Sequence, residues 1–490
     1  MKIAIIGMGI SGSSTLKHLF DLKALDSNDT IDIFEPRNEI GTGFAYQVDD
    51  ETLLMNSYSS RLSLNEDQPR EYLEWLNQHH PEYLNDDFSP RHIFGLYLRD
   101  KYEPYLKFDQ VRHIKERVID IEIKEPERLQ FNIMTEQQRY SDYDFIFMTI
   151  GHPPYADYYH LNGSTNYIHN PYPLSQTLNS IDKDDRIGII GSSLTAIDIT
   201  HSLMSHHELN HPILLFSRFQ PFTNVKNQLY NQPIVLTMDE EWIDQQKEVH
   251  SGYIPLELMW KQLQQDMQAN GVNMMDAIHK YQVGSVSAMK IQTQDTPLDL
   301  QIIQRYVGLL TAYLPSLNMA LSPADRQLFH SKYKRLFEHF RTQFPAFKMK
   351  LMHHWLENQK IKFITGLEDI KPQADGTYIV QTREGYQHPV DVLINATGFD
   401  MNLSKAASMD SMISNLYRRE IFMQNSLGGV QISWPKSHPL SPKYGEILNM
   451  TLSGAWIFTT QFGNNNAQMT ARHGKTMVQE FINYRKMLGK

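Results

Sequence analysis

Three glycines near the start of the chain have the spacing that the phosphates of a dinucleotide require. Gly7, Gly9 and Gly12 form the pattern G-x-G-x-x-G, and Glu35 follows 23 residues after the last of them. The first glycine allows a tight turn, the second lets the backbone approach a pyrophosphate, and the third lets a helix pack closely on a strand. The acid would accept hydrogen bonds from a ribose. Together these residue types predict a dinucleotide site.

The elements that must position these residues follow from the apolar pattern. The run 2–6 suits a strand buried on both faces, residues 13–20 can form a helix, and 30–34 reads as a second strand. The turn would then end at a helix N-terminus, whose unpaired N–H groups and partial positive charge attract phosphates. We expect Ile10, Ser11 and Pro36 at the same site. A glycine turn without a ligand is the alternative, and the flanking strands and the acid argue against it.

The sequence repeats this arrangement from residue 186. A strand over 186–190 leads into the turn Gly191-Ser192-Ser193-Leu194-Thr195-Ala196, and the next strand, 212–216, is followed by Ser217-Arg218. Arg218 lies 22 residues after Ala196, in the place of the first motif's acid, and an arginine there favours a 2′-phosphate. The second site is therefore predicted to bind NADPH rather than NADH. Ser193 stands where a glycine usually lets the pyrophosphate approach, so a purely structural repeat is the alternative.

A stretch of helical spacing, from about residue 223 to 347, interrupts the second nucleotide domain. Ser322 is expected to cap a helix that starts at Pro323. Insertions of this kind often carry substrate specificity, so part of this one could roof an active site. The predicted helices of the insertion are 239–246, 256–269, 300–313 and 325–340. Further strands are predicted over 118–123, 143–148, 360–366, 378–382, 391–395 and 455–460, with a closing helix over 468–487.

The predicted fold class is therefore α/β, with two Rossmann-like dinucleotide-binding domains and a helical insertion in the second. The expected bounds are 1–180 for the first domain, 181–384 for the second, and 385–490 for a segment that returns to the first. The strand ends at Thr149, Gly151, Thr397 and Gly398 are expected to mark the places where the chain crosses between the domains.

Composition excludes several classes of protein. The chain has 490 residues, a net charge of -10 and no cysteine. The acidic balance argues against a nucleic-acid surface, and the lack of cysteine removes disulfides, thiolate metal sites and dithiol redox centres. No apolar run is long enough to span a bilayer and no signal peptide fits before the first strand, so we expect a cytoplasmic protein without membrane partners. The histidines give no metal-site spacing, so no metal is predicted, and the oligomeric state is not indicated.

Several longer segments resemble a known family. Gly41-Thr42-Gly43-Phe44-Ala45-Tyr46, Leu54-Met55-Asn56 and 191–198 are similar to FAD/NAD(P)-binding proteins that include FAD-dependent urate hydroxylase. More distantly, the layout resembles class B flavin monooxygenases and N-hydroxylases. The resemblance covers most of 1–225 and 360–490. It implies a two-dinucleotide-binding-domain flavoprotein with FAD on the first motif and NADPH on the second.

The resemblance also implies which residues meet the cofactors. Val118 would contact the adenine of FAD through its backbone, and Asn56, Arg61 and Gln468 are the catalytic candidates around the flavin ring. Arg61 could offset the negative charge of the reduced flavin, and His473 is expected at the surface or near the flavin. The full set of expected cofactor contacts is Gly7, Gly9, Ile10, Ser11, Gly12, Glu35, Pro36, Gly43, Asn56, Val118, Thr149, Gly151, Gly191, Ser192, Ser193, Leu194, Thr195, Arg218, Thr397, Gly398, Asn464 and Asn465.

The function that the resemblance implies is that of an NADPH-dependent FAD oxidoreductase, a flavin monooxygenase acting on a small molecule. In such enzymes NADPH reduces the flavin, and oxygen adds at C4a to give a hydroperoxide. The segment His169-Asn170-Pro171-Tyr172 does not match the FxGxxxH signature of flavin monooxygenases. An oxidase or dehydrogenase without a working NADPH site, and a nucleotide-bound sensor without turnover, are the alternatives. A disulfide reductase is excluded by the lack of cysteine, unless a partner supplies the thiols.

Overall fold

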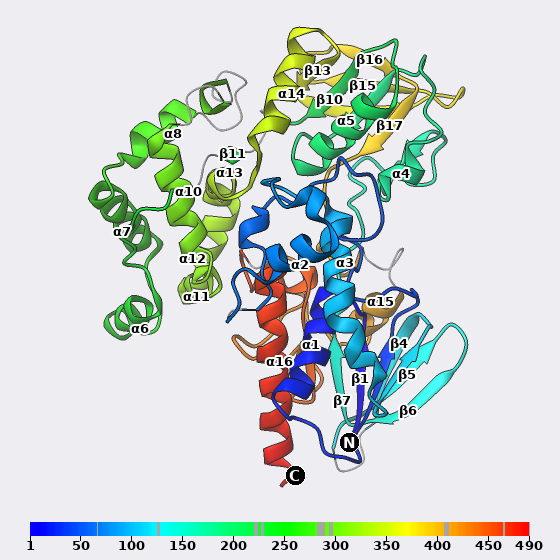
Figure 1. The fold of residues 1–490 in the computed structure, drawn as a ribbon, viewed down its shortest axis with the longest axis vertical. Coiled ribbons are helices and arrows are strands. Elements are labelled where there is room, and N and C mark those ends of the chain that lie inside the picture. The colour runs from blue at the N-terminus through cyan, green and yellow to red at the C-terminus, as the bar shows by residue number, and fades with distance from the viewer. Residues whose placement is uncertain are drawn as a thin grey trace. The chain divides into compact units, whose positions relative to one another are not determined.

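The chain folds into two compact units, each built on its own parallel sheet (Figure 1). The computed structural model describes residues 1–65, 67–124, 128–219, 224–226, 230–281, 290–293, 297–405, 411–463 and 466–489. Unit 1 comprises Met1–Val48, Ser57–Pro154 and Phe399–Lys490, and unit 2 comprises Asp49–Asn56 and Tyr155–Gly398. The chain passes between the units after Pro154 and after Gly398, close to the strand ends where the crossings were expected. The expected domain bounds at 180 and 384 differ from these, because strands at 167–168 and 392–395 pair within the sheet of unit 2. The predicted α/β class is confirmed.

The sheet of unit 1 has five parallel strands in the order β20-β7-β1-β2-β3. Because all five run the same way, their carboxyl ends meet at one edge, which is where ligands bind in such sheets. The strands are β1 (Lys2–Ile6), β2 (Thr30–Phe34), β3 (Val111–Ile114), β7 (Phe145–Met148) and β20 (Met450–Leu452). Two small antiparallel sheets accompany them: β4 (Val118–Lys124), β5 (Gln130–Thr135) and β6 (Arg139–Tyr143); β18 (Leu440–Ser441) and β19 (Gly445–Glu446).

Five α-helices and four 3-10 helices complete the described part of unit 1. The α-helices are α1 (Ile10–Asp21), α2 (Glu71–His79), α3 (Arg91–Tyr102), α15 (Ser411–Arg418) and α16 (Ala467–Met487). The 3-10 helices are Ser59–Arg61, Pro81–Tyr83, Glu103–Lys107 and Ala455–Ile457. The helices α1 and α16 pack closely, because Ser14 Oγ donates to the Ala471 carbonyl at 2.6 Å and a Cβ at Gly474 would lie 2.8 Å from Ser14 Oγ.

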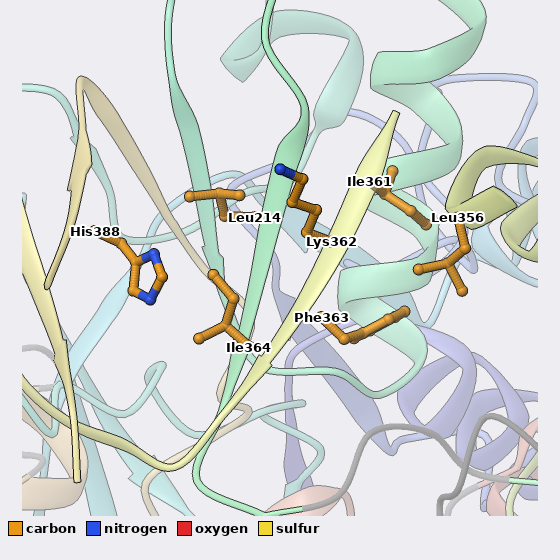
Figure 2. Close-up of a pocket in the computed structure, with 7 residues that line it drawn as sticks. All are labelled: Leu214, Leu356, Ile361, Lys362, Phe363, Ile364 and His388. Atoms are coloured by element: carbon orange, nitrogen blue, oxygen red, sulfur yellow. The ribbon is translucent and has the colours of Figure 1, made fainter. Parts of the chain in front are cut away.

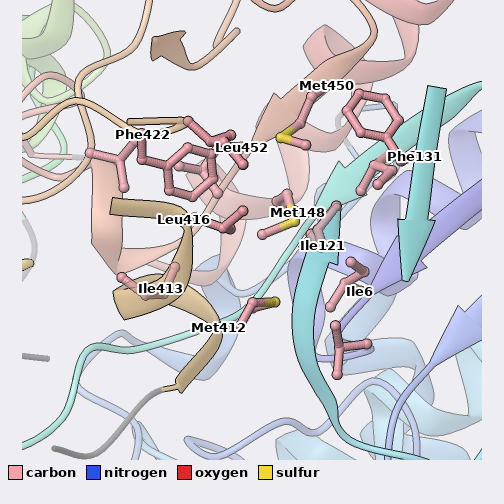
Figure 3. Close-up of a cluster of buried hydrophobic side chains, with 14 of the residues drawn as sticks. Ile6, Ile121, Phe131, Met148, Met412, Ile413, Leu416, Phe422, Met450 and Leu452 are labelled. Atoms are coloured by element: carbon pink, nitrogen blue, oxygen red, sulfur yellow. The ribbon is translucent and has the colours of Figure 1, made fainter. Parts of the chain in front are cut away.

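Side chains of β7 alternate between two packed faces, which explains why this strand is apolar throughout. Phe145 and Phe147 have ring centres 5.1 and 5.9 Å from that of Phe481 in α16. Ile146 and Met148 belong to the core on the opposite face, where the small β4–β6 sheet and α15 cover the strands (Figure 3). That core includes Ile6, Ile121, Phe131, Met412, Ile413, Leu416, Met450 and Leu452.

The sheet of unit 2 repeats the parallel arrangement in the order β13-β10-β9-β17-β8. Its strands are β8 (Tyr167–Ile168), β9 (Ile187–Ile190), β10 (Ile213–Ser217), β13 (Ile361–Thr365) and β17 (Val392–Asn395). A three-stranded antiparallel sheet consists of β14 (Leu367–Pro372), β15 (Tyr378–Thr382) and β16 (Gln387–Val390). The helices flanking these strands are α4 (Leu174–Thr177), α5 (Leu194–His206) and α14 (Ala346–Glu357).

The insertion between β10 and β13 is helical, as predicted. It holds α6 (Glu240–Val249), α7 (Leu256–Ala269), α8 (Met274–Tyr281), α10 (Leu298–Leu310), α11 (Leu314–Ala320), α12 (Pro323–Leu328), a π-helical turn (Phe329–Tyr333) and α13 (Lys334–Arg341). A parallel pair, β11 (Asn224–Lys226) and β12 (Gln343–Pro345), closes its two ends. The predicted cap is confirmed, since Ser322 Oγ accepts from the Asp325 N–H at 3.1 Å. None of the described helices has the length and apolar run that crossing a membrane requires.

One predicted strand is wrong. Residues 455–460 do not join a sheet; they begin with a 3-10 helix, and the edge strand of unit 1 is β20, a few residues earlier. Gly454 has φ +103°, which turns the backbone sharply after β20, and the Trp456 carbonyl accepts from the Val430 N–H at 2.8 Å. The apolar side chains that suggested a strand, Trp456 and Ile457, are instead buried in the core of unit 1.

Candidate functional site: two nucleotide turns

The first glycine turn joins β1 to α1 and is tied to the neighbouring strands. Gly7 has φ +91°, and its N–H donates to the Phe34 carbonyl at 2.9 Å. A Cβ at Gly7 would lie 2.4 Å from the Thr149 carbonyl oxygen, and one at Gly12 would lie 2.1 Å from the Gly7 oxygen. Both glycines are therefore required by the fold itself.

Gly9 stands in a different environment. A Cβ added at Gly9 would meet only the Gly43 backbone, at 3.4 Å. Gly43 has φ +54°, and a Cβ added there would lie 3.1 Å from the Gly9 Cα. The loop that carries Gly43 is held against the turn by the Gly41 N–H, which donates to the Met8 carbonyl at 2.8 Å. Two bare backbones thus approach each other immediately before α1. This is the kind of surface that a pyrophosphate can approach closely.

The N-terminus of α1 has donors to offer. Gly9 is the N-cap residue and supplies no side chain to satisfy the first turn, in which the first intrahelical bond runs from the Ser13 N–H to the Gly9 carbonyl. Ser11 is 6% exposed, and its hydroxyl has no hydrogen-bond partner among the described residues. Unpaired N–H groups and a buried hydroxyl at a helix N-terminus suit an anion. Ile10, the first helical residue, lies half-buried beside them.

Glu35 follows β2 and faces the glycine turn. Its carboxylate accepts from the Met8 N–H at 3.0 Å and from the Arg37 N–H at 3.1 Å. Arg37 in turn donates to the Gly43 carbonyl at 2.8 Å, so the acid, the turn and the Gly43 loop form one hydrogen-bonded group. A carboxylate oxygen accepts more than one hydrogen bond, which leaves Glu35 able to hold a ribose hydroxyl. Pro36 is exposed next to it.

Three further candidates in unit 1 have supporting positions. The Thr149 hydroxyl lies 2.6 Å from the Gly7 carbonyl oxygen and 2.9 Å from that of Ile6, so it braces the turn. Gly151 has φ +77°, and a Cβ there would meet nothing within 4 Å. Val118 is buried at the start of β4.

The structure brings two of the three catalytic candidates together. The side-chain amide of Gln468, in the first turn of α16, donates to the carbonyl oxygens of Arg61 and Ser63. The third, Asn56, belongs to unit 2, where its carbonyl accepts from the Lys226 ammonium. The expected contacts Asn464 and Asn465 lie outside the described residues.

His473 of α16 belongs to a buried network, so of the two expected positions the surface is wrong and the neighbourhood of the flavin stays a prediction. Its Nε2 lies 2.6 Å from Ser437 Oγ and 2.7 Å from Gln461 Nε2, and its Nδ1 lies 3.0 Å from Ser453 Oγ. An amide nitrogen only donates, so Nε2 accepts and Nδ1 carries the proton. Burial lowers the pKa of His473 to about 4. The imidazole is therefore neutral at pH 7, and it fixes the segment that follows β20 against α16.

The second turn, between β9 and α5, is closed in the same way as the first. Gly191 has φ +122°, its N–H donates to the Phe216 carbonyl at 2.8 Å, and a Cβ there would lie 2.4 Å from the Ala396 carbonyl oxygen. Ser193 is the exposed N-cap of α5, and its side chain makes no capping bond. The residues beside it, Ser192, Leu194 and Thr195, are half-buried. The serine that replaces the middle glycine therefore has an exposed side chain at the N-terminus of α5.

The strand end after β17 is held by side-chain hydrogen bonds. Thr397 Oγ1 donates to Asn395 Oδ1 at 2.8 Å, and Asn395 Nδ2 donates to the Ala156 carbonyl at 3.0 Å. Gly398, with φ +87°, accepts from the Ala156 N–H at 2.9 Å and ends unit 2. These contacts give Thr397 a structural role beside the second turn.

Arg218 lies exposed just beyond β10, with its guanidinium 5.2 Å from the centre of the Tyr158 ring. Its carbonyl accepts from Arg383 Nη2 at 3.2 Å. Sequence reasoning did not find Arg383, because it follows β15, far from either glycine motif, and no spacing relates it to Arg218.

A cavity of about 610 Å³ lies around the edge strand β13, apart from the predicted site residues (Figure 2). Figure 2 shows Leu214, Ile364 and His388 on one side of the strand and Ile361 and Phe363 on the other. Its lining is mainly apolar and includes none of the residues at either glycine turn. Within the described ranges, no three His, Cys, Asp or Glu side chains are placed to share a metal ion.

Comparison with known proteins defines the class of this fold. Residues 4–153, which contain the first turn, match the FAD-NAD(P)-binding family. L-lysine 6-monooxygenase from Pseudomonas syringae has a similar structure, with a TM-score of 0.62, 13% identity and 98% of both chains covered. The ornithine N-hydroxylase of Kutzneria sp. 744 gives a TM-score of 0.59 at 14% identity, with 99% of both chains covered. At this identity the likeness establishes a shared fold and confirms the two-dinucleotide-domain architecture.

A sequence relative comes from Escherichia coli (strain K12). Its uncharacterised protein YdhS is 26% identical over 223 residues, which are 42% of this chain and 40% of that protein. The chain thus matches about two fifths of the length of this curated relative.

Proposed function

We propose that the protein is an NADPH-dependent FAD oxidoreductase, a flavin monooxygenase that acts on a small molecule. The observation that carries this proposal is the first turn, where Gly9 and Gly43 leave the backbone bare and the Ser11 hydroxyl has no partner among the described residues. A pyrophosphate fits this combination, because it takes hydrogen bonds from the N–H groups of α1 and from a hydroxyl. Glu35 would hold the adenosine ribose of FAD.

In unit 2 the corresponding residues would hold NADPH. The exposed Ser193 hydroxyl and the first N–H groups of α5 would bind the pyrophosphate, and Arg218 would bind the 2′-phosphate. This assignment of the coenzyme rests on an arginine where the first motif has an acid. An acid would repel a phosphate and accept from a free hydroxyl instead.

Bound FAD would accept a hydride from NADPH and let molecular oxygen give one atom to the substrate while the other leaves as water. The residues of this chain would orient the bound cofactor and substrate and exclude water from them. The Gln468 amide, in the first turn of α16, fixes the Arg61 backbone, so Arg61 stands beside the N-terminus of that helix. Positive charge and helix N–H groups at that place would favour an anionic reduced ring.

The neighbouring structures support this reading of the fold. One of them is a lysine monooxygenase, and the other is an ornithine N-hydroxylase described with reduced FAD, NADP+ and L-ornithine. We extend only the reaction class to this chain and propose a small-molecule substrate without fixing its chemistry. The net charge of -10 fits a protein without a nucleic-acid partner. We place the activity in the cytoplasm, because its reductant would be a coenzyme of the cell interior.

The test is an anaerobic reduction of the FAD-loaded protein. We expect NADPH to bleach the flavin absorbance at a concentration at least about tenfold below that of NADH, as one favourable arginine–phosphate contact would give. Readmitted air should then reoxidise the flavin with NADPH consumed, and candidate substrates can be screened for an incorporated oxygen atom.

The other possible results of this experiment would each contradict part of the proposal. A bound flavin that neither nucleotide bleaches would remove the NADPH assignment and favour an oxidase or dehydrogenase. A protein that takes up no FAD would refute the proposal as a whole.

A further inference from the structure

Phe219, the residue directly after Arg218, lies between two more arginines. Its ring is 50% exposed, the Arg335 guanidinium carbon lies 4.5 Å from the ring centre, and that of Arg383 lies 5.5 Å away. Guanidinium groups are attracted to the negative face of an aromatic ring, so both side chains are held beside Phe219. Arg383 also donates to the Arg218 carbonyl. Arg335 and Arg383 therefore both contact the pair Arg218-Phe219, which follows β10.

These arginines come from three distant parts of unit 2. Arg218 follows β10, Arg383 lies beyond the end of β15, and Arg335 belongs to α13 in the helical insertion. Arg218 is further positioned by the Tyr158 ring, at 5.2 Å. The insertion therefore reaches the end of β10, next to the place where the second nucleotide motif has its arginine.

The positive charge of this cluster is not cancelled by an ion pair within the described part of the chain. Other arginines of unit 2 have such partners, since Arg341 binds Glu338 at 2.8 Å and Arg186 binds Asp391 at 2.5 Å. The charges of Arg218 and Arg383 both act on Tyr159, as does that of Asp369 in β14, so these two arginines lie in one neighbourhood. Because none of the three guanidinium groups has an ion pair within the described residues, the cluster keeps a positive charge.

An excess of guanidinium groups at this position has a chemical consequence. Like charges held close together repel, and an anion that binds among them relieves the repulsion. Guanidinium groups bind phosphate through two parallel N–H···O bonds, which an ammonium group cannot do. The end of the second strand of a nucleotide-binding sheet is where the 2′ position of the adenosine ribose is read.

We propose that Arg335 and Arg383 are specificity-determining residues which, together with Arg218, bind the 2′-phosphate of NADPH. The helical insertion thereby takes part in selecting the coenzyme. This inference rests on the proposed function and adds two residues that lie outside both glycine motifs. The Phe219 ring holds the two added guanidinium groups in place before the phosphate arrives.

The test uses the full-length, FAD-loaded protein and two small probes, adenosine 2′,5′-bisphosphate and adenosine 5′-monophosphate, with calorimetry as the readout. We expect Arg335→Gln and Arg383→Gln each to weaken the bisphosphate about tenfold, and to leave the monophosphate within about twofold, because only the 2′-phosphate contact is lost. Lys332→Gln is the matched control. It removes an exposed positive charge one turn before Arg335 without touching Phe219, and both affinities should stay within about twofold.

The outcomes separate the two proposals. A wild-type protein that prefers the bisphosphate while neither variant changes that preference would overturn this inference and leave the NADPH assignment intact. Equal weakening of both probes would make Arg335 and Arg383 structural residues, which also overturns it. A wild-type protein without any preference would remove the NADPH assignment on which the inference rests.

Discussion

Gly9 and Gly12 belong to one motif, yet different neighbours require each of them to be glycine. A Cβ at Gly12 would enter the space of the Gly7 carbonyl oxygen, at 2.1 Å, whereas a Cβ at Gly9 would touch only a glycine backbone, at 3.4 Å. Gly9 also has φ −73°, which any residue can adopt. The fold alone therefore tolerates a methyl group at Gly9 and not at Gly12, and under the proposed function it is the pyrophosphate of FAD that requires a glycine at position 9.

This difference predicts opposite effects for two alanine substitutions. Gly9→Ala should leave the melting temperature of the cofactor-free protein within about 2 °C and weaken FAD at least about tenfold, because the methyl group would stand where the pyrophosphate approaches. Gly12→Ala should lower the free energy of unfolding without any ligand by about 1–3 kcal/mol, through overpacking. Thermal unfolding and FAD titration of both variants measure the two effects. Equal loss of stability in both variants would contradict the assignment of Gly9 to a ligand.

At the same scale, the sequence predicted the site only where its residues follow a motif. The glycines, Glu35 and Arg218 could be found because a fixed spacing relates each of them to a strand end. Arg335 and Arg383 could not, since only the packing of α13 and of the turn after β15 brings them to Phe219. Their signal is geometric, and no periodicity in the sequence carries it.

At the scale of elements, the long buried strands and some insertion helices could be predicted, whereas α8 and α11 were not. The single helix predicted over 325–340 is divided by a π-helical turn into α12 and α13. The strand β9 was found as a continuous apolar run, and α7 begins and ends at the predicted residues 256 and 269. β20 has only three residues, too few for any pattern, so the longer apolar run at 455–460 was taken for the strand in its place. The apolar run at 455–460 is buried because Trp456, which is 0% exposed, packs in the core of unit 1. A short apolar run that is buried by tertiary packing thus has the same sequence pattern as a buried strand.

Helix α16 closes unit 1, and its buried His473 makes that closure sensitive to pH. Burial lowers the pKa of His473 to about 4 in the folded protein, against about 6.5 in an unfolded chain. Above about pH 7.5 neither state binds an appreciable fraction of a proton at this residue. As the pH falls toward 4, the unfolded chain takes up the proton and the folded chain does not, so stability falls. Between about pH 7.5 and about pH 5, this linkage lowers the free energy of unfolding by about 2 kcal/mol.

We expect His473→Gln to reduce the acid-induced loss of stability by about this amount in the cofactor-free protein. Urea unfolding at several pH values measures it, and His79→Gln, at an exposed position of α2, is the control that should leave the profile unchanged. His201 and His330 also have pKa values that burial lowers to about 4, and they account for part of the acid-induced loss of stability that remains in the variant. A His473→Gln profile parallel to the wild type would show that this histidine does not carry the linkage.

At the scale of the whole molecule, each unit has its own sheet, its own core and one predicted nucleotide site. A ligand that binds only the folded form stabilises it by about 2.7 kcal/mol at a hundred times its dissociation constant. If each unit unfolds as a cooperative body, each coenzyme should stabilise only the unit that binds it. The melting of the protein would then consist of two transitions with separate ligand dependence.

Scanning calorimetry should therefore show two transitions, with FAD raising the one that belongs to unit 1 and NADP+ the one that belongs to unit 2, each by about 5–10 °C. Substitutions identify the transitions. Gly9→Ala should reduce the shift by FAD alone, and Arg218→Gln should reduce the shift by NADP+ alone, because each variant changes the site of a single unit. A single transition that either coenzyme raises would mean that the two units unfold together, and the nucleotide sites would then be coupled through the stability of the whole chain.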